Sequence, residues 1–156
     1  MELCDGGTLF LDEVADMSLP TQAKLLRFIE YRNFKRVGGA EDISVDIRIV
    51  AASNKDLESE VRTGRFRSDL YFRLKVVSIH LPPLAERGDD VLLLARHFLR
   101  EFSRKFNKDF RDIATEAARL MLSYRWPGNV RELRNLVERL LIMCRNDPIT
   151  RRDLPD

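Results

Sequence analysis

The hydrophobic pattern separates a first part of the chain with short apolar runs from a second part with helical periodicity alone. Thr8–Leu11 is apolar without alternation, which is typical of a strand covered on both faces in a parallel sheet. Apolar and polar residues alternate over Ile43–Ile49, and Val50–Ala52 is apolar throughout, so a second strand is expected. Val76–Leu81 predicts a third strand, which ends at Pro82 because proline cannot donate to a strand ladder.

Helical signals connect these strands and fill the remaining sequence. The expected helix starts share a small polar or acidic residue that suits an N-cap, at Ser18, Asp56, Asp89 or Asp90, Thr115 and Asn129. Glu132 stands three residues after Asn129, the spacing of a capping box. The pattern therefore predicts an α/β part over residues 1–83 and an all-helical part over residues 84–156.

Composition and charge exclude several classes of protein. With 44% hydrophobic and 33% charged residues, the 156-residue chain is expected to be soluble and globular. It has no apolar run of membrane-spanning length and no signal-peptide pattern, so we expect a cytoplasmic protein without membrane contacts. Cys4 and Cys144 match no metal-ligand spacing. A net charge of +2 is too small to argue for nucleic-acid binding by itself.

Two adjacent carboxylates follow the first predicted strand. Asp12 and Glu13 are expected at its carboxyl end, where open α/β sheets bind ligands. One carboxylate there can hold a divalent cation while the other polarises a water molecule, so the pair suits the metal and water half of a phosphoryl-transfer site. A solvated loop start is the alternative. Asn54 follows the second strand and is suited either to the same site or to capping the next helix.

Six motifs in order resemble those of bacterial sigma-54-dependent transcription activators, which are AAA+ ATPases. Gly6–Val14 is similar to their Walker B strand, Gln22–Arg27 followed by Arg36–Gly39 to their helix and second surface loop, and Arg48–Asn54 to their sensor I strand. Gly64–Leu74 is similar to their arginine-finger segment, Leu81–Leu84 followed by Glu86 and Arg87 to their lid junction, and Trp126–Leu133 to their sensor II helix. The resemblance covers nearly the whole chain. It implies the C-terminal half of the AAA+ α/β core over residues 1–83, a partial P-loop-type parallel sheet with flanking helices, and an all-α lid over residues 84–156.

The resemblance also implies roles at the carboxyl ends of the strands, with ATP and Mg²⁺ as cofactors. Asp12 is expected to help hold Mg²⁺, and Glu13 to orient or activate the attacking water. Asn54 is expected to sense the γ-phosphate.

Three arginines complete the implied site. Arg67 and Arg73 are expected to act as fingers that reach into the nucleotide site of the next subunit, and Arg131 of the lid to contact the nucleotide of its own subunit. Arginine suits this work because its planar, permanently charged fork matches phosphate oxygens. The alternatives are surface pairs of Arg67 and Arg73 with Asp69 and Glu60, and packing of Arg131 against Glu132 or Glu138.

Several expected parts are absent from the 156 residues. The sequence has no Gly-x-x-x-x-Gly-Lys-Ser/Thr phosphate loop, no sigma-contacting Gly-Ala-Phe-Thr-Gly-Ala loop and no helix-turn-helix. Ser68, Lys75 and Ala85 depart from the residues that the family often carries, which leaves the tuning of the subunit interface open.

We therefore expect a fragment that is inactive alone. The resemblance implies that its parent forms a ring, a hexamer by family, and remodels RNA polymerase holoenzyme carrying sigma-54 so that promoter DNA opens. The parent would contact DNA through a C-terminal domain outside this sequence. The alternative is a non-catalytic DNA-binding or interaction module built on the helices of 89–145.

Overall fold

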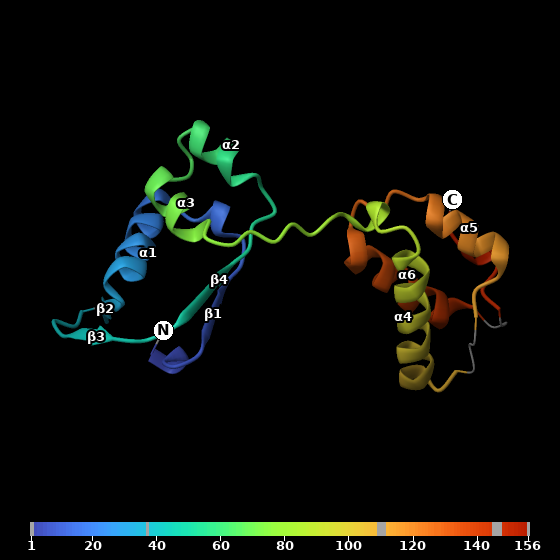
Figure 1. Ribbon diagram of the computed structural model, residues 1–156. Helices are drawn as coiled ribbons and strands as arrows, with labels where there is room; N and C mark the ends of the chain where they lie inside the picture. Colours follow the sequence, from blue (N-terminus) through green and yellow to red (C-terminus); the bar gives the residue numbers. More distant parts are fainter. Residues whose placement is uncertain (1, 37, 109–111, 145–147, 156) are drawn as a thin grey trace. The chain divides into compact units, whose positions relative to one another are not determined.

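A computed structural model describes residues 2–36, 38–108, 112–144 and 148–155. The chain divides into two compact units, Met1–Ile79 (unit 1) and His80–Asp156 (unit 2), shown in Figure 1. Among the described residues, the four strands lie in unit 1 and the regular elements of unit 2 are helices. No helix among the described residues is long and apolar enough to cross a membrane.

Two pairs of short strands form the sheets of unit 1. Strands β1 (Thr8–Leu11) and β4 (Arg48–Ala51) pair in parallel, with Leu9 opposite Ile49 and Phe10 opposite Val50. Strands β2 (Asn33–Lys35) and β3 (Asp42–Ser44) form an antiparallel hairpin. The parallel pair confirms the predicted α/β class, since such strands need a crossover connection, here containing α1.

Three helices accompany these strands: α1 (Leu19–Tyr31), α2 (Leu57–Arg62) and α3 (Ser68–Leu74). Helix α1 carries a proline in its first turn, which tolerates the missing N–H, and ends at Arg32 in the left-handed conformation. Leu25 and Phe28 of α1 pack with Phe66 and Leu70 into the core of unit 1. Leu9, Leu11 and Ile49 pack against this core, so α1 and α3 cover one face of the parallel pair (Figure 1).

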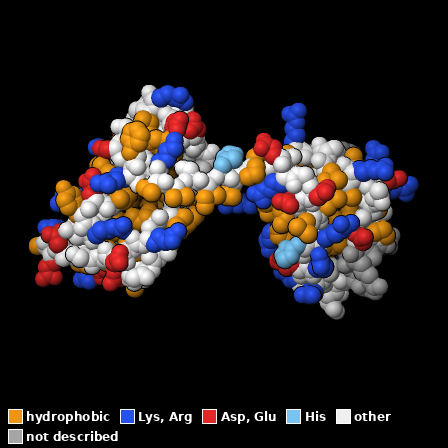
Figure 2. All heavy atoms as spheres, in the orientation of Figure 1, with side chains coloured by type: hydrophobic (Ala, Val, Ile, Leu, Met, Phe, Trp, Pro, Cys, Tyr) orange, Lys and Arg blue, Asp and Glu red, His pale blue; other side chains and the backbone are white. Residues whose placement is uncertain are grey.

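The other face of the parallel pair is exposed. Phe10 keeps 58% and Val50 keeps 38% of its surface accessible, and these two residues are register partners. Hydrophobic side chains accordingly appear on the surface of unit 1 in Figure 2. The predicted coverage of Thr8–Leu11 on both faces is therefore wrong in this structure. An apolar run reports the chemistry of the residues, whereas coverage depends on which elements the chain supplies to each face.

The predicted third strand does not form. Residues 78–83 have no regular secondary structure, and the apolar side chains of Val76, Val77, Ile79 and Leu81 are 75–83% exposed. A strand exists only where a neighbour completes its hydrogen-bond ladder, and no described strand lies beside this segment.

The predicted second strand is split in two by a change of backbone partner. Val45 N–H still donates to Arg32 O, which continues the hairpin register by one residue, but Asp46 N–H donates to the Asp5 carboxylate. The chain therefore leaves the hairpin after Val45, before β4 pairs with β1. Val45 and Ile47 are nevertheless buried. The alternation correctly identified the buried side chains but not the interruption of the strand.

Unit 2 packs three helices, α4 (Asp90–Phe106), α5 (Thr115–Ser123) and α6 (Asn129–Met143), around one core. All three predicted helices are confirmed. Trp126 lies in the loop that connects α5 to α6, and its side chain is buried in the core. Its Nε1 donates to Met121 O at 2.8 Å. Asn129 is not the cap: its Oδ1 accepts from Leu84 N–H, while Glu132 Oε2 accepts from Gly128 N–H at 2.7 Å.

Truncation of Leu99 tests the core of unit 2. Leu99 is fully buried on α4, so Leu99→Ala should lower the free energy of unfolding by about 2–5 kcal/mol through lost contacts and a residual cavity. Urea unfolding followed by Trp126 fluorescence measures this, because Trp126 is the chain's one tryptophan and lies in unit 2. Leu93→Ala on the same helix, where Leu93 is 64% exposed, should change stability by only about 0.5 kcal/mol or less. Equal losses for the two variants would contradict the assignment of the core.

Candidate functional site

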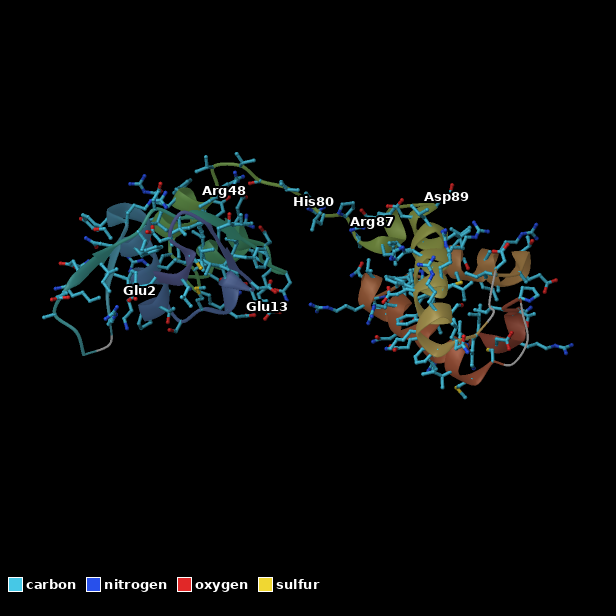
Figure 3. All side chains as sticks on the ribbon, turned by 90° about the horizontal axis from the view of Figure 1, so that it is seen from below. Glu2, Glu13, Arg48, His80, Arg87 and Asp89 are labelled. Carbon is cyan, nitrogen blue, oxygen red and sulfur yellow. The ribbon has the colours of Figure 1, made fainter. Side chains whose placement is uncertain are left out.

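The acidic pair forms a short turn at the carboxyl end of β1. Ala52 N–H donates to Leu11 O at 2.8 Å, and Val14 N–H donates to Ala52 O at 3.0 Å. Asp12 and Glu13 therefore lie between two backbone hydrogen bonds that hold the turn against the end of β4. Both side chains are exposed (Figure 3 labels Glu13). The sheet fixes the backbone, and the carboxylates are left accessible to a ligand.

Glu13 adopts an uncommon backbone conformation. Its φ of 51° and ψ of 44° lie in the left-handed region, which costs a non-glycine residue about 1–2 kcal/mol. Its N–H donates to the Asp12 carboxylate Oδ1 at 3.0 Å. The buried residues Val14 and Ala15 follow at once in a short 3₁₀ turn, Val14–Asp16. Strain of this kind, held by a buried neighbour, is typical of functional turns.

Asn54 lies at the same edge of the sheet. β1 and β4 run in parallel with Leu11 opposite Ala51, so the residues that follow each strand emerge together. Asn54 is exposed, and its side chain has no hydrogen bond to any described residue. Helix α2 is capped by Asp56, whose Oδ1 accepts from Glu58 N–H at 3.1 Å. The alternative in which Asn54 caps this helix is therefore wrong.

The edge formed by Asp12, Glu13 and Asn54 suits a magnesium ion that arrives with a nucleotide. No group of three or more described His, Cys, Asp or Glu residues is placed to hold a metal ion alone. Mg²⁺ characteristically takes one or two protein carboxylates and completes its octahedron with phosphate oxygens and water. The Asp12 carboxylate could provide the one protein ligand that such an ion needs.

Helix α3 presents the two predicted finger arginines. Phe66 and Leu70 are buried and anchor the start of the helix, while Arg67 and Arg73 are exposed. Arg67 makes a two-pronged ion pair with Asp69, with Nε–Oδ1 at 3.0 Å and Nη2–Oδ2 at 2.7 Å. This pair holds the pKa of Asp69 below its ordinary value of 3.8. The surface pair that the sequence offered as the alternative thus exists for Arg67.

The alternative of a surface pair between Arg73 and Glu60 is wrong, because Arg73 lies near a different acid. Arg73 lies near Glu30 of α1, with Nη2–Oε1 at 3.8 Å. Glu60 instead binds Arg65 through two hydrogen bonds of 2.7 and 2.8 Å, which lower the pKa of the Glu60 carboxyl. The contact of Arg73 is long and exposed, and such pairs contribute little to stability.

Arg131 lies in the first turn of α6 in unit 2 and is exposed. It makes no ion pair with any described residue, although the helix dipole disfavours a cation there. Glu132 accepts from Gly128 N–H and the Tyr124 hydroxyl, and Glu138 pairs with Lys105 at 3.0 Å. Both acids named as alternative partners of Arg131 are thus occupied by other groups.

Sequence reasoning placed Gln22 in the motif Gln22–Arg27 but gave it no role of its own, although the residue is fully buried and bonds to the arginine segment. The available signal was a polar residue within the apolar stripe of α1, at helical spacing from Leu25 and Ile29. Its side-chain oxygen accepts a hydrogen bond from the backbone N–H of Arg67.

Two protein families match consecutive parts of the chain. Residues 1–80 match the Sigma-54 interaction domain, and residues 85–156 match the AAA+ ATPase lid domain. The second match assigns the helical region to an ATPase lid and so favours the ATPase interpretation over a DNA-binding module.

Individual relatives agree with this assignment. The nitrogen fixation protein AnfA of Azotobacter vinelandii is 51% identical over 154 residues, which are 99% of this chain and 29% of AnfA. The transcriptional regulatory protein ZraR of Salmonella typhimurium is 48% identical over 97% of this chain and 34% of its own length. The chain thus spans about a third of these relatives.

Solved structures of NtrX from Brucella abortus share the fold. The complex with ADP has a TM-score of 0.92 and 40% identity, and covers 99% of this chain and 36% of NtrX. The complex with ATP has a TM-score of 0.91 and 40% identity, over 97% of this chain and 35% of NtrX. This chain therefore belongs to the Sigma-54 interaction domain family of AAA+ ATPases, the family of the sigma-54-dependent transcription activators, and corresponds to its part from Walker B through the lid.

Proposed function

We propose that this chain supplies the second half of an ATP-hydrolysing site in a longer activator that remodels sigma-54 RNA polymerase holoenzyme. The observation that carries the proposal is the grouping of Asp12, Glu13 and Asn54 at one edge of the parallel pair. The family match and the ATP and ADP complexes of NtrX support it. Promoter opening by the longer protein would follow from ATP-driven remodelling.

At this edge the Asp12 carboxylate would bind Mg²⁺, and Glu13 would accept a hydrogen bond from the attacking water and orient it. The chemistry that the ion would supply when bound by Asp12 is neutralisation of the charge that develops during phosphoryl transfer. Asn54 can donate its side-chain amide to a γ-phosphate oxygen and thereby distinguish ATP from ADP. The exposed positions of all three side chains support these roles.

Arg67 and Arg73 would serve the nucleotide of an adjacent subunit in a ring, hexameric by family. Arg67, the N-cap residue of α3, and Arg73, within the helix, are both exposed. For Arg67 to bind phosphate, it must exchange the Asp69 carboxylate for phosphate oxygens, which its fork matches equally well. Arg131, whose first-turn position lacks an ionic partner among the described residues, would bind nucleotide from the lid of its own subunit.

Loss of an arginine should abolish turnover in the longer protein. We expect Arg67→Ala or Arg73→Ala to lower kcat for ATP about 10³–10⁵-fold, because each guanidinium would stabilise charge formed in the transition state. Arg62→Ala is the matched control, since Arg62 is also exposed but pairs with Asp56 at 3.8 Å. Steady-state ATPase assays measure these rates. The 156-residue chain, which lacks a phosphate-loop sequence, should show no turnover. Robust hydrolysis by this chain alone, or equal rates in Arg67→Ala and Arg62→Ala, would contradict the proposal.

The Arg67–Asp69 pair has a signature that does not depend on activity. The pKa of Asp69 is held below its ordinary value of 3.8, first by Arg67. The pair is thus intact above that value and is lost as the pH falls through the lowered pKa. Arg67→Ala should raise the pKa of Asp69 toward 3.8 in a carbon-13 NMR titration of the carboxyl. Arg73→Ala should leave it unchanged, since Arg73 contacts Glu30 instead. An unchanged pKa in Arg67→Ala would rule out the pair.

A further inference from the structure

Gln22 is a buried polar side chain for which the proposed chemistry gives no role. It lies in the first half of α1 with 0% of its surface accessible, on the stripe that also buries Leu25. Burying an amide stabilises a protein only if its donors and acceptor are paired, since an unpaired group costs about 1–3 kcal/mol. Its three hydrogen bonds therefore decide what the residue does.

One of these bonds is local and fixes the direction of the amide. Nε2 donates to Met17 O at 2.8 Å, five residues back along the chain and just before α1 begins. Met17 closes the short turn Val14–Asp16 that follows the acidic pair, through its N–H to Val14 O. The amide is thus held next to the turn Val14–Asp16, which directly follows Glu13.

The other two bonds reach the arginine segment, more than 40 residues away. Nε2 also donates to Arg65 O at 3.0 Å, and Oε1 accepts from Arg67 N–H at 2.9 Å. Arg67 is the N-cap residue of α3, and its own carbonyl accepts from Tyr71 N–H at 3.1 Å. Gln22 therefore fixes the backbone of Arg67 at the point where α3 starts.

The remaining polar groups of this short segment are bound elsewhere. Glu60 O accepts from both Arg65 N–H at 2.9 Å and Phe66 N–H at 3.1 Å, and the Phe66 ring is buried in the core. Glu60 O thus binds the N–H groups of Arg65 and Phe66, whereas Gln22 binds the N–H of Arg67. Of these two residues, only Gln22 contacts the backbone of Arg67.

Glutamine is suited to this position by both length and polarity. An amide provides two N–H donors and one carbonyl acceptor in a fixed plane, and all three are used here. Glutamate keeps the acceptor but would face two carbonyl oxygens with a carboxylate. Methionine keeps the approximate volume but leaves three backbone groups without their partner.

We propose that Gln22 is the positioning residue that sets Arg67 for its contact with a neighbouring subunit's nucleotide. This inference rests on the proposed function. Gln22 does not touch the nucleotide; it acts through the backbone of the arginine that its own subunit donates. The turn of Asp12 and Glu13 is held independently of Gln22 by the backbone hydrogen bonds of Ala52 to Leu11 and of Val14 to Ala52. Loss of Gln22 should therefore impair the adjacent subunit's site far more than the site that contains its own Asp12 and Glu13.

Hydrogen exchange in the 156-residue chain tests the contact itself. Gln22→Met should speed exchange of the Arg67 amide at least tenfold, whereas the Phe66 amide, bound to Glu60, should change far less. Ile47→Val, a mild truncation in the same core, is the control for general loosening. If Gln22→Met does not fold, Gln22→Asn serves instead, since it keeps an amide but is one methylene too short for its oxygen to reach Arg67 N–H. Unchanged exchange at Arg67 overturns the inference whatever the ATPase result.

Mixed assemblies of the longer protein test the direction of the effect. Gln22→Met alone should lower kcat at least tenfold with little change in KM for ATP, because the finger acts on the transition state. Mixed with Glu13→Gln subunits, it should regain activity as Arg67→Ala does, since the Glu13→Gln subunits donate an intact Arg67. Mixed with Arg67→Ala subunits, it should regain none.

The possible failures are distinguishable. If Arg67→Ala with Glu13→Gln recovers activity but Gln22→Met with Glu13→Gln does not, Gln22 acts within its own site and the inference is wrong. A normal rate for Gln22→Met alone also overturns it. If the unmodified longer protein does not hydrolyse ATP, the proposed function fails, and the exchange experiment still decides whether Gln22 holds Arg67.

Discussion

The parallel pairing of β1 with β4 is the constraint on which the site depends. Because the two strands run in the same direction and in register, the residues that follow them emerge at one edge. The hydrogen bonds of Ala52 to Leu11 and of Val14 to Ala52 extend this pairing past the strands. The turn of Asp12 and Glu13 is thereby held next to the segment of Asn54, with Glu13 in a strained conformation that a free loop would not keep.

One hydrophobic core in unit 1 supports both the segment after the acidic pair and the arginine segment. Leu25 and Phe28 of α1 pack against Phe66 and Leu70, so the helix that follows the acidic pair also supports the arginine segment. The buried Gln22 adds direction to this packing, because hydrophobic contacts alone do not fix the orientation of a backbone N–H.

Much of this arrangement was predictable from the sequence, and the failures have physical causes. The strand Thr8–Leu11, the short helix ending at Arg62 and the three helices of unit 2 were predicted because their signals are local. The strand predicted over Val76–Leu81 fails because a strand depends on a neighbour that no local pattern supplies. The predicted cap at Asn129 fails because a distant group, Leu84 N–H, takes its side chain. The candidate site residues were found from sequence motifs. The role of Gln22 became visible only in the structure, because its side chain bonds to backbone groups of Arg65 and Arg67, which lie 43 and 45 residues away in sequence.

The central claim is that one chain contributes the acidic edge to its own nucleotide and the arginines of α3 to the next. The most direct measurement is a crystal structure of the longer protein assembled with Mg²⁺, ADP and a γ-phosphate mimic. We predict Mg²⁺ bound at the Asp12 carboxylate, Glu13 and Asn54 facing the γ-phosphate mimic from the same chain, and Arg67 facing it from the adjacent subunit. A γ-phosphate mimic contacted by Arg67 of the same chain, or bound away from the edge of Asp12, Glu13 and Asn54, would contradict the claim.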